Sequence, residues 1–370
     1  MSDLARRDFQ RICLIKPSSP GDIIHALPVL RGLRQRYPKA HLAWLVATSF
    51  ANLIEVDPAL DEVILFDRRR FGRLGRSWLV TRDFIVFVGE LRRRRIDLMV
   101  DLQGLFRSGF LALASGATTR VGFRDTREFA WLFYNHAIPR AARDTHAADR
   151  NWQVADMLGL DPSAPHTLDF TIALTEEDRR HAAELLAEVG IAYGFSSSPA
   201  TRSPYAVLVP GTRWETKCWA DERFGRLAAE IKQRHGISSI LVGGSSDRDA
   251  GQKAMESSAG AAHNLCGRTT LRQLAALIDR AAVVVTADST PMHMAAAHGR
   301  PLVALFGPTN PARTGPYGRG EDVLRLDLAC APCYLRRLSQ CAHQHRCMEE
   351  LTVEIVAEAV SKRLGRSFSK

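Results

Sequence analysis

Short apolar runs alternate with helix-length amphipathic segments in two separate series, and this alternation is what most constrains the fold of the chain. Such alternation favours a parallel β-sheet with helices on both faces, so the chain is predicted to form two Rossmann-like α/β lobes. The strand-like runs of the first series are 11–16, 41–46, 62–66 and 97–101, and those of the second are 205–209, 239–242, 283–286 and 302–306. The expected helices are 22–37, 49–55 and 81–94, then 221–235, 247–257, 271–278 and 291–297.

A chain of 370 residues exceeds what one hydrophobic core usually supports, so two domains are expected. The pattern weakens after residue 161, passes through a charged helix at 176–189 and reaches Phe195-Ser-Ser-Ser-Pro-Ala200, which has the composition of a linker. We therefore predict domains at 1–195 and 196–348. Residues 349–370 are predicted to form a final amphipathic helix that could pack back on the first domain.

Charge indicates the kind of partner. Lys and Arg outnumber Asp and Glu by 50 to 40, and the arginines are concentrated in the first half. Nucleic acid, anionic lipid and phosphorylated sugar all fit this excess. For Arg92 to Arg95, a solvated helix face explains the charge equally well. No apolar run reaches the ~18 residues of a spanning helix, and the polar start lacks the features of a secretory signal, so a cytoplasmic protein is expected.

Four cysteines fall close together near the C-terminus: Cys330, Cys333, Cys341 and Cys347. A C-x2-C pair followed by two further cysteines is compatible with a structural zinc site. The later spacings are irregular, however, and unliganded loop thiols are the default interpretation.

Polar loops follow several predicted strands, where ligands bind in open α/β sheets. In the first loop, Gly21 permits close backbone approach and Asp22 is either a helix cap or a general base. Residues 211–217 are either a plain turn with a solvated lysine or a phosphate-binding loop in which Lys217 neutralises charge. After the next strand, Gly243 and Gly244 precede Asp247, which could accept hydrogen bonds from sugar hydroxyls.

The strand at 283–286 leads into Asp288-Ser-Thr-Pro-Met-His293, with a proline near the first turn of the next helix. The N–H groups of that turn are suited to a diphosphate. Ser289 and Thr290 could instead cap the helix, and His293 could be a core histidine. Gly307-Pro-Thr309 ends the following strand at the same predicted sheet edge, which favours a shared site.

These motifs together resemble the family 9 glycosyltransferases, the lipopolysaccharide heptosyltransferases, and most closely the type that adds the first heptose. The resemblance extends over nearly the whole chain. It rests on K-x-S-S-x-G-D at 16–22, D-L-Q-G at 101–104, the segment 214–219, Gly243-Gly244, D-S-T-P-M-H at 288–293 and L-F-G-P-T at 305–309. Segments 126–128, 132–135 and 145–147 carry the likeness to the first type.

The resemblance implies a GT-B fold, with two Rossmann-like domains facing across a cleft. It also implies transfer of heptose from ADP-heptose to Kdo on lipid A at the inner face of the cytoplasmic membrane, with inversion and without a catalytic metal or other cofactor. By position, Asp22 is the base and Lys217 assists the leaving group. The donor residues so implied are Thr212, Arg213, Lys217, Asp247, Asp288, Ser289, Thr290 and His293, and the acceptor residues are Ser19, Gly21, Arg68, Arg69, Arg127 and His146.

Two other classes of function share some features of this sequence. A Rossmann oxidoreductase is disfavoured because no G-x-G-x-x-G follows the first strand. A nucleic-acid-binding protein is permitted by the arginines, but aromatic residues interleaved with basic ones and the usual nucleic-acid motifs are absent from the sequence. A third alternative keeps the fold and changes the substrate to another nucleotide sugar or to the second inner-core heptose acceptor.

Overall fold

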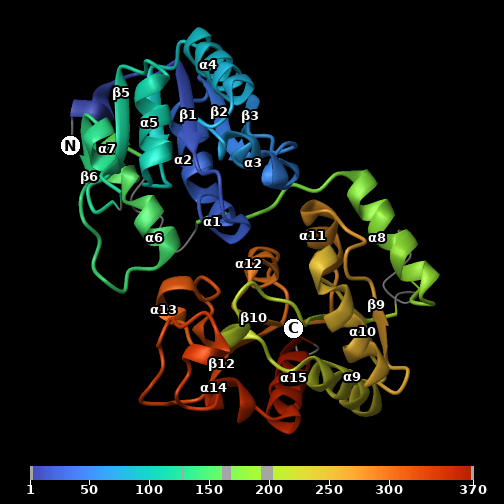
Figure 1. Cartoon of the computed structure of the whole chain (residues 1–370). Helices are drawn as coiled ribbons and strands as arrows, with labels where there is room; N and C mark the ends of the chain where they lie inside the picture. Colours follow the sequence, from blue (N-terminus) through green and yellow to red (C-terminus); the bar gives the residue numbers. More distant parts are fainter. Residues whose placement is uncertain (1–2, 127, 161–167, 193–202, 368–370) are drawn as a thin grey trace. The chain divides into compact units, whose positions relative to one another are not determined.

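The computed structural model describes residues 3–126, 128–160, 168–192 and 203–367. The chain divides into two compact units, Met1–Ala173 and Leu174–Lys370 (Figure 1). Each unit is an α/β layer structure built on one six-stranded parallel sheet. The two predicted lobes are therefore present.

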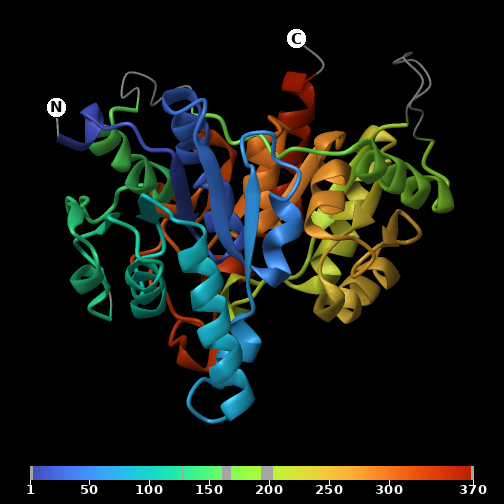
Figure 2. The same ribbon diagram turned by 90° about the horizontal axis from the view of Figure 1, so that it is seen from above.

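The sheet of the first unit has the strand order β3-β2-β1-β4-β5-β6, and every pairing is parallel. Its central strands are apolar and buried, as expected for strands covered by helices on both faces. In Figure 2 the blue strands of this sheet run side by side. The strands are β1 (Arg11–Ile15), β2 (His41–Ala47), β3 (Glu62–Phe66), β4 (Leu98–Asp101), β5 (Thr119–Phe123) and β6 (His136–Ile138).

The helices of this unit are α1 (Pro20–Ile24), α2 (Leu27–Arg36), α3 (Arg68–Phe71), α4 (Trp78–Arg93), α5 (Phe106–Ala114), α6 (Ala147–Trp152) and α7 (Val154–Leu158), with 3-10 turns η1 (Asp3–Arg6), η2 (Thr48–Leu53) and η3 (Ala130–Phe133). Helices α4 and α5 cover one face of the sheet, where Phe84 and Leu111 pack against Cys13, Ile15 and Leu45. The single helix expected at 22–37 is two helices, because Pro28 in the first turn of α2 cannot donate a helical hydrogen bond to the preceding turn.

The second unit repeats this plan with the strand order β12-β11-β10-β7-β8-β9, again with parallel pairings. Its strands are β7 (Tyr205–Val209), β8 (Ser238–Leu241), β9 (Ala262–Asn264), β10 (Val283–Ala287), β11 (Leu302–Phe306) and β12 (Val323–Arg325). Its helices are α8 (Glu176–Glu188), α9 (Asp221–His235), α10 (Arg248–Glu256), α11 (Leu271–Asp279), α12 (Thr290–Ala297), α13 (Pro311–Thr314), α14 (Arg346–Glu349) and α15 (Val353–Ser367). The 3-10 turns are η6 (Glu215–Lys217), η7 (Ser245–Asp247), η8 (Gly320–Asp322) and η9 (Leu338–Gln340).

The division between the units falls at residues 173 and 174, earlier than the expected boundary at 195 and 196. The reason is α8, which packs against α11 and is joined to it by a 2.6 Å ion pair between Asp178 and Arg272. The expected linker at 195–200 lies outside the described residues. Helix α15 packs on α9 and β11, and its side chains Val356, Val360 and Leu364 belong to the core of the second unit.

Candidate functional site

Four loops of the second unit follow adjacent strands of one sheet. Strands β11, β10, β7 and β8 are neighbours and run parallel, so the loops after them leave the sheet at a common edge. Contacts between Lys217 and Asp288, between Thr309 and Asp288, and between Gly211 and Asp247 join these loops in pairs. The convergence predicted from the sequence is therefore present within this unit.

Lys217 and Asp288 form the central contact of this edge. The Lys217 ammonium donates to Oδ2 of Asp288 over 2.6 Å and to the Asp288 carbonyl over 3.3 Å. Their side chains are only 14% and 7% exposed. Thr309 adds a hydroxyl donor to the same Oδ2 at 2.8 Å. The loops after β7, β10 and β11 thus meet at one carboxylate oxygen through charge-assisted hydrogen bonds.

Ser289 and Thr290 lie where β10 turns into α12. Ser289 is the residue before the helix and has extended backbone, but its side chain does not cap the helix. Its hydroxyl instead pairs with the Thr286 hydroxyl at 2.8 Å. The first turn of α12, with Pro291 in it, therefore keeps the arrangement that favours an anion. His293 is buried on the same helix.

Asp247 is held tightly between two loops. Its Oδ2 accepts from the backbone amide of Gly244 at 2.7 Å. A Cβ on Gly211 would lie 2.2 Å from the Asp247 Cγ, and one on Gly243 would lie 2.7 Å from its Oδ2. Glycine is needed at both positions because the carboxylate occupies the space beside them. Asp247 thus fixes its own loop against the loop after β7.

The loop after β7 also carries Trp214, which the sequence analysis did not assign a role. The Lys217 ammonium lies 4.5 Å from the centre of the Trp214 ring, and the Arg336 guanidinium lies 4.8 Å from it. Cation–π contacts of this kind restrict the lysine to one position. Thr212 in the same loop is half-buried, whereas Arg213 is exposed.

The segment between β12 and α14 supports this loop from outside. Thr216 donates to the Leu335 carbonyl at 2.5 Å, and the Leu338 amide donates to Glu215 at 3.0 Å. His345 donates from Nε2 to the Thr216 carbonyl at 2.8 Å. We call residues 335–345 the brace. Sequence patterns could not identify it, because its contacts join residues more than a hundred positions apart.

The structure gives no support to the zinc site considered from the sequence for the four cysteines around the brace. Within residues 3–126, 128–160, 168–192 and 203–367, no group of three or more His, Cys, Asp or Glu side chains could hold a metal ion. Tetrahedral zinc requires four ligand atoms gathered around one point. All four cysteines are free, and burial, aided by the neighbouring Cys333, Cys341 and Cys330, raises the pKa of Cys347 to about 11.

In the first unit, the loop after β1 places Asp22 in the first turn of α1. Oδ2 of Asp22 accepts from the Ser19 hydroxyl at 2.7 Å and from the Ser19 amide at 3.0 Å. Ser19, rather than Asp22, is therefore the residue that precedes the helix. Gly21 is buried beside it. A carboxylate on the first turn lies beside the positive end of the helix dipole.

Behind this loop lies a buried polar cluster. Lys16 donates to the Leu102 carbonyl at 2.7 Å, and burial lowers its pKa while Asp22 and Asp101 oppose that change. Tyr134 donates to Oδ2 of Asp101 at 2.6 Å. Burial raises the pKa of Asp101 despite this hydrogen bond and those from the loop that follows it. The cluster fixes the start of the Asp-Leu-Gln-Gly loop.

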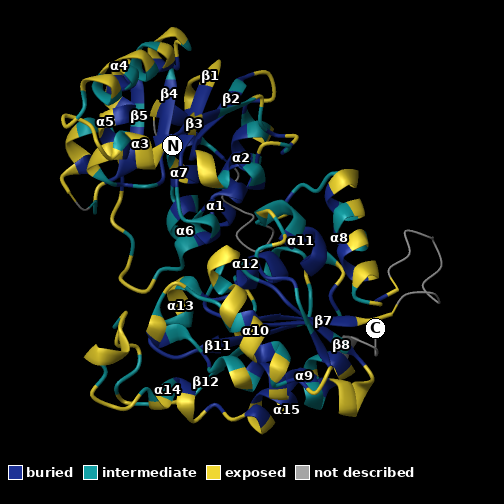
Figure 3. Cartoon of the chain, turned by 45° about the vertical axis from the view of Figure 1, so that its right-hand side comes forward, coloured by how far each residue is buried: buried dark blue, intermediate teal, exposed yellow. Residues whose placement is uncertain are grey.

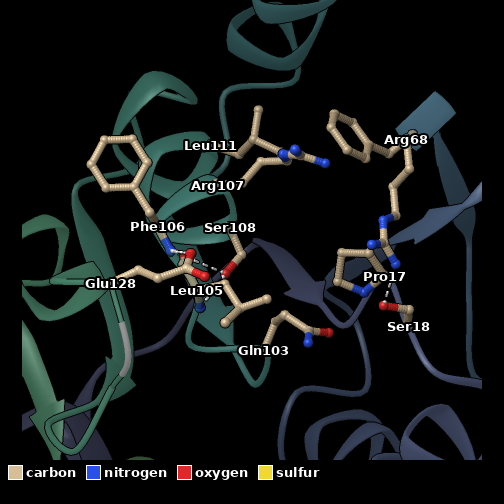
Figure 4. Close-up of a pocket in the computed structure, with 11 residues that line it drawn as sticks. Pro17, Ser18, Arg68, Gln103, Leu105, Phe106, Arg107, Ser108, Leu111 and Glu128 are labelled. Carbon is tan, nitrogen blue, oxygen red and sulfur yellow. Dashed lines mark hydrogen bonds between the residues drawn. The ribbon is translucent and has the colours of Figure 1, made fainter. Parts of the chain in front are cut away.

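A cavity of about 320 Å³ opens beside these loops (Figure 4). Arg68 reaches it from α3 and donates to the Ser18 hydroxyl at 2.9 Å, while Arg107 reaches it from α5. The close-up shows both guanidinium groups directed toward the space above Gln103. The remaining lining residues are Pro17, Phe66, Leu105, Phe106, Ser108, Leu111 and Glu128. Two cations and several polar groups suit an anionic ligand.

The other predicted acceptor residues are distributed differently. Arg69 is exposed next to Arg68. His146 precedes α6 and accepts at Nδ1 from the Ala148 amide at 3.1 Å, and its ring contacts that of His25 at 5.1 Å. Arg127 lies outside the described residues. Asp22 and Lys217, the two predicted catalytic residues, lie in different units.

No helix in the described part of the chain combines the length and the apolar character needed to cross a bilayer.

The sequence of the chain is similar to those of known proteins. The chain matches the model of glycosyltransferase family 9 (heptosyltransferase) over residues 86–343. Lipopolysaccharide heptosyltransferase 1 of Pseudomonas aeruginosa is 32% identical over 327 residues, covering 87% of this chain and 86% of that protein.

Two solved structures share the fold. The glycosyl transferase family 9 protein from Veillonella parvula has a TM-score of 0.78 and 25% identity, covering 97% of this chain and 98% of that one. E. coli heptosyltransferase WaaC with ADP-2-deoxy-2-fluoro heptose has a TM-score of 0.74 and 24% identity, covering 95% and 99%. These likenesses confirm the predicted GT-B fold class.

Proposed function

The chain belongs to glycosyltransferase family 9 (heptosyltransferase), and on this premise we propose that it transfers heptose from ADP-heptose to Kdo of the lipopolysaccharide inner core. The acceptor is Kdo-lipid A, so the enzyme works in the cytoplasm at the inner face of the membrane, as a peripheral protein. Nucleic acid is not its partner.

The observation that carries this proposal is the meeting of Lys217, Asp288 and Thr309 beside the start of α12. A nucleotide diphosphate leaves with increased negative charge, and a lysine and helix N–H groups that already point to one place stabilise that charge without rearrangement. Asp288 holds the ammonium in position. The proposed donor residues are the eight predicted from the resemblance, with Trp214 added beneath Lys217.

In the proposed reaction, a Kdo hydroxyl oxygen attacks the anomeric carbon of heptose from the face opposite ADP. The new carbon–oxygen bond forms as the bond to the ADP oxygen breaks, which inverts the anomeric centre. Asp22 accepts the hydroxyl proton as general base. ADP departs with the electron pair of the broken bond, and Lys217 neutralises part of its charge. No metal or cofactor takes part.

The cavity between Arg68 and Arg107 supports an acidic acceptor, because Kdo carries a carboxylate and lipid A carries phosphates. Ser19, Gly21, Arg69, Arg127 and His146 complete the proposed acceptor set.

The test is to incubate the purified enzyme with Kdo-lipid A and a panel of nucleotide sugars, and to identify products by mass spectrometry. Addition of one heptose from ADP-heptose, with release of ADP, is the expected result. Transfer only to an acceptor that already carries one heptose would favour the second-heptose activity. Transfer only from another nucleotide sugar would show that the donor assignment is wrong.

A further inference from the structure

The outer face of α4 is apolar where a helix on a soluble protein is normally polar. Phe84 and Leu91 on the inner face pack into the sheet. On the opposite face, Trp78 is 75% exposed, Ile85 is 61% exposed, and Leu79 and Val86 are also exposed. Helical periodicity of 3.6 residues puts these four side chains on one side, with Arg82 and Arg93 among them. The helix is therefore apolar on both faces.

Neighbouring elements continue this apolar face. Phe106, Phe110 and Leu113 are exposed on α5 at positions i, i+4 and i+7, which form one stripe. Helix α5 contacts both α4 and η3. The Phe110 ring lies 6.2 Å from that of Phe84 below α4 and 6.3 Å from that of Phe133 in η3. Helix α5 is thus in direct contact with both α4 and η3.

Around η3, Phe129 is 68% exposed and Leu132 is 61% exposed, and Trp131 is exposed between them. We call the outer faces of α4, α5 and η3 the α4–α5 surface. Yellow, exposed segments mark α4 and α5 in Figure 3. Twelve of the fifteen exposed large apolar side chains in the described part of the chain lie between Leu65 and Leu132. Ten of these, all except Leu65 and Leu74, belong to α4, α5 or the segment around η3, which are in contact with one another. Such concentration marks an interaction surface rather than scattered exposure.

The charge on this surface is strongly positive. The segment from Arg68 to Arg95 holds ten arginines and two acidic residues, Asp83 and Glu90. Asp83 is already paired with Arg70 and with Arg82, and Glu90 with Arg93. Arg69, Arg73 and Arg76 are exposed. Aromatic and aliphatic side chains set among exposed arginines match the composition of protein faces that lie in a membrane interface.

We propose that the α4–α5 surface is the membrane-docking face of the protein and that its partner is an anionic phospholipid bilayer. Trp78, Ile85, Phe110 and Leu132 insert among the acyl chains near the headgroups. The arginines contact lipid phosphates, which hold them near the surface by charge attraction. The protein lies on the bilayer without spanning it.

This inference deepens the proposed function, because a lipid-anchored acceptor has to be reached from the bilayer. Phe106 both lines the cavity beside Arg68 and begins the exposed stripe of α5. The cavity therefore opens next to the α4–α5 surface. An acceptor sugar can enter it while the acyl chains of the same molecule stay in the membrane.

The first experiment measures binding of the full-length protein to vesicles with no substrate present. Wild type is expected to float with vesicles of phosphatidylcholine and phosphatidylglycerol, and more weakly with phosphatidylcholine alone. The Trp78→Gln/Ile85→Gln variant is expected to bind at least tenfold more weakly. Ile355→Gln, which changes an exposed isoleucine on α15, is the matched control and should bind like wild type. Unchanged thermal unfolding would show that every variant is folded.

Charge is tested separately. Arg82→Gln/Arg93→Gln should lose most of the preference for phosphatidylglycerol and most of the sensitivity to salt, whereas Arg226→Gln on α9 should keep both. A third measurement compares heptose transfer to vesicle-borne acceptor with transfer to a soluble, deacylated acceptor. Trp78→Gln/Ile85→Gln should slow only the first.

Three results would overturn the docking face. Wild type could fail to bind vesicles, Trp78→Gln/Ile85→Gln could bind as well as Ile355→Gln, or Trp78→Gln/Ile85→Gln could convert a dimer into a monomer with no change in vesicle binding. Because vesicle binding is measured without substrates, its failure is distinguishable from a failure of heptose transfer.

Discussion

Oδ2 of Asp22 accepts hydrogen bonds from both the hydroxyl and the amide of Ser19, at 2.7 and 3.0 Å. Asp178 makes the same pair of contacts with Thr175 at the start of α8, at 2.5 and 2.9 Å. The two aspartates are a natural matched pair. Both stabilise a helix start, and only Asp22 is proposed to remove a proton.

Asp22→Asn should reduce kcat by about 10²-fold or more, because an amide cannot accept the acceptor proton. Its remaining oxygen still accepts from Ser19, so the Kd for ADP-heptose should change little. Asp178→Asn should affect thermal unfolding but leave turnover near normal. Steady-state kinetics and calorimetry test both variants, and comparable turnover in the two would remove Asp22 from the mechanism.

Lys217→Ala should lower kcat/KM by about 10²-fold, since one preorganised donor to the leaving diphosphate is lost. Affinity for ADP should also fall, and this is measurable by titration calorimetry. Lys232→Ala is the control, because the Lys232 ammonium donates to the Gly236 carbonyl and the Ser238 hydroxyl at the C-terminal end of α9. Unchanged ADP affinity in Lys217→Ala would contradict the phosphate role.

Gly211→Ala should destabilise the second unit by about 1–3 kcal/mol through overpacking, because the added Cβ would lie 2.2 Å from the Asp247 Cγ. Donor affinity should fall as the loop moves. Asp247→Ala removes the side chain that the new Cβ would meet. The double variant Gly211→Ala/Asp247→Ala should therefore lose less stability than the sum of the two single losses. Gly320→Ala, which meets nothing within 4 Å, is the control.

Tyr134→Phe should lower stability in a pH-dependent way. Burial raises the pKa of Asp101 above its ordinary value of 3.8, so the folded state holds this proton more tightly than the unfolded state. The stabilising contribution of this carboxyl is therefore complete below pH 3.8 and is lost as the pH rises through its folded pKa. Loss of the Tyr134 donor leaves the charged form less stabilised.

The penalty of Tyr134→Phe should consequently grow as the pH rises through that window. Thermal unfolding at a series of pH values measures it. Tyr37→Phe is matched, because Tyr37 donates to the neutral Leu158 carbonyl at 3.3 Å, and its penalty should not vary with pH over that range. Parallel pH profiles for the two variants would contradict the argument.

Chelation by EDTA should leave the rate of heptose transfer unchanged, since Lys217 and the helix N–H groups are proposed to supply the positive charge at the diphosphate. The assay compares initial rates before and after EDTA, and again after addition of Mg²⁺ or Zn²⁺. A rate that falls with EDTA and returns with one ion would require a metal in the mechanism.

Short apolar runs predict eight strands of the two sheets, and two of these runs show why. Val283–Ala287 and Leu302–Phe306 are buried throughout, so their hydrophobicity alone indicates strands. The short strands His136–Ile138 and Val323–Arg325 gave no such signal. Their pairing depends on neighbouring strands, which sequence periodicity does not encode.

The sequence predicts the loops of the candidate site but not the contacts between them. Strand ends identified the loops of Lys217 and Asp288, but not the hydrogen bond between residues 71 positions apart. The run of arginines at 92–95 also does not show which of these arginines have structural roles. Arg94 forms a 2.6 Å ion pair with Glu62, and Arg92 donates to the Ala114 carbonyl at 2.8 Å. Pattern gives position along the chain, whereas these roles depend on tertiary packing.

The brace connects the thiols near the C-terminus indirectly to the turn that carries Lys217, a proposed catalytic residue. Leu335, Leu338 and His345 support the Glu215–Lys217 turn, and Cys341 lies between them in the chain with Cys333 just before them. Alkylation of either thiol, or a proteolytic cut in this stretch, is expected to weaken these contacts with the turn. We expect such damage to weaken binding at the proposed nucleotide site, although the altered atoms belong to none of the proposed donor residues.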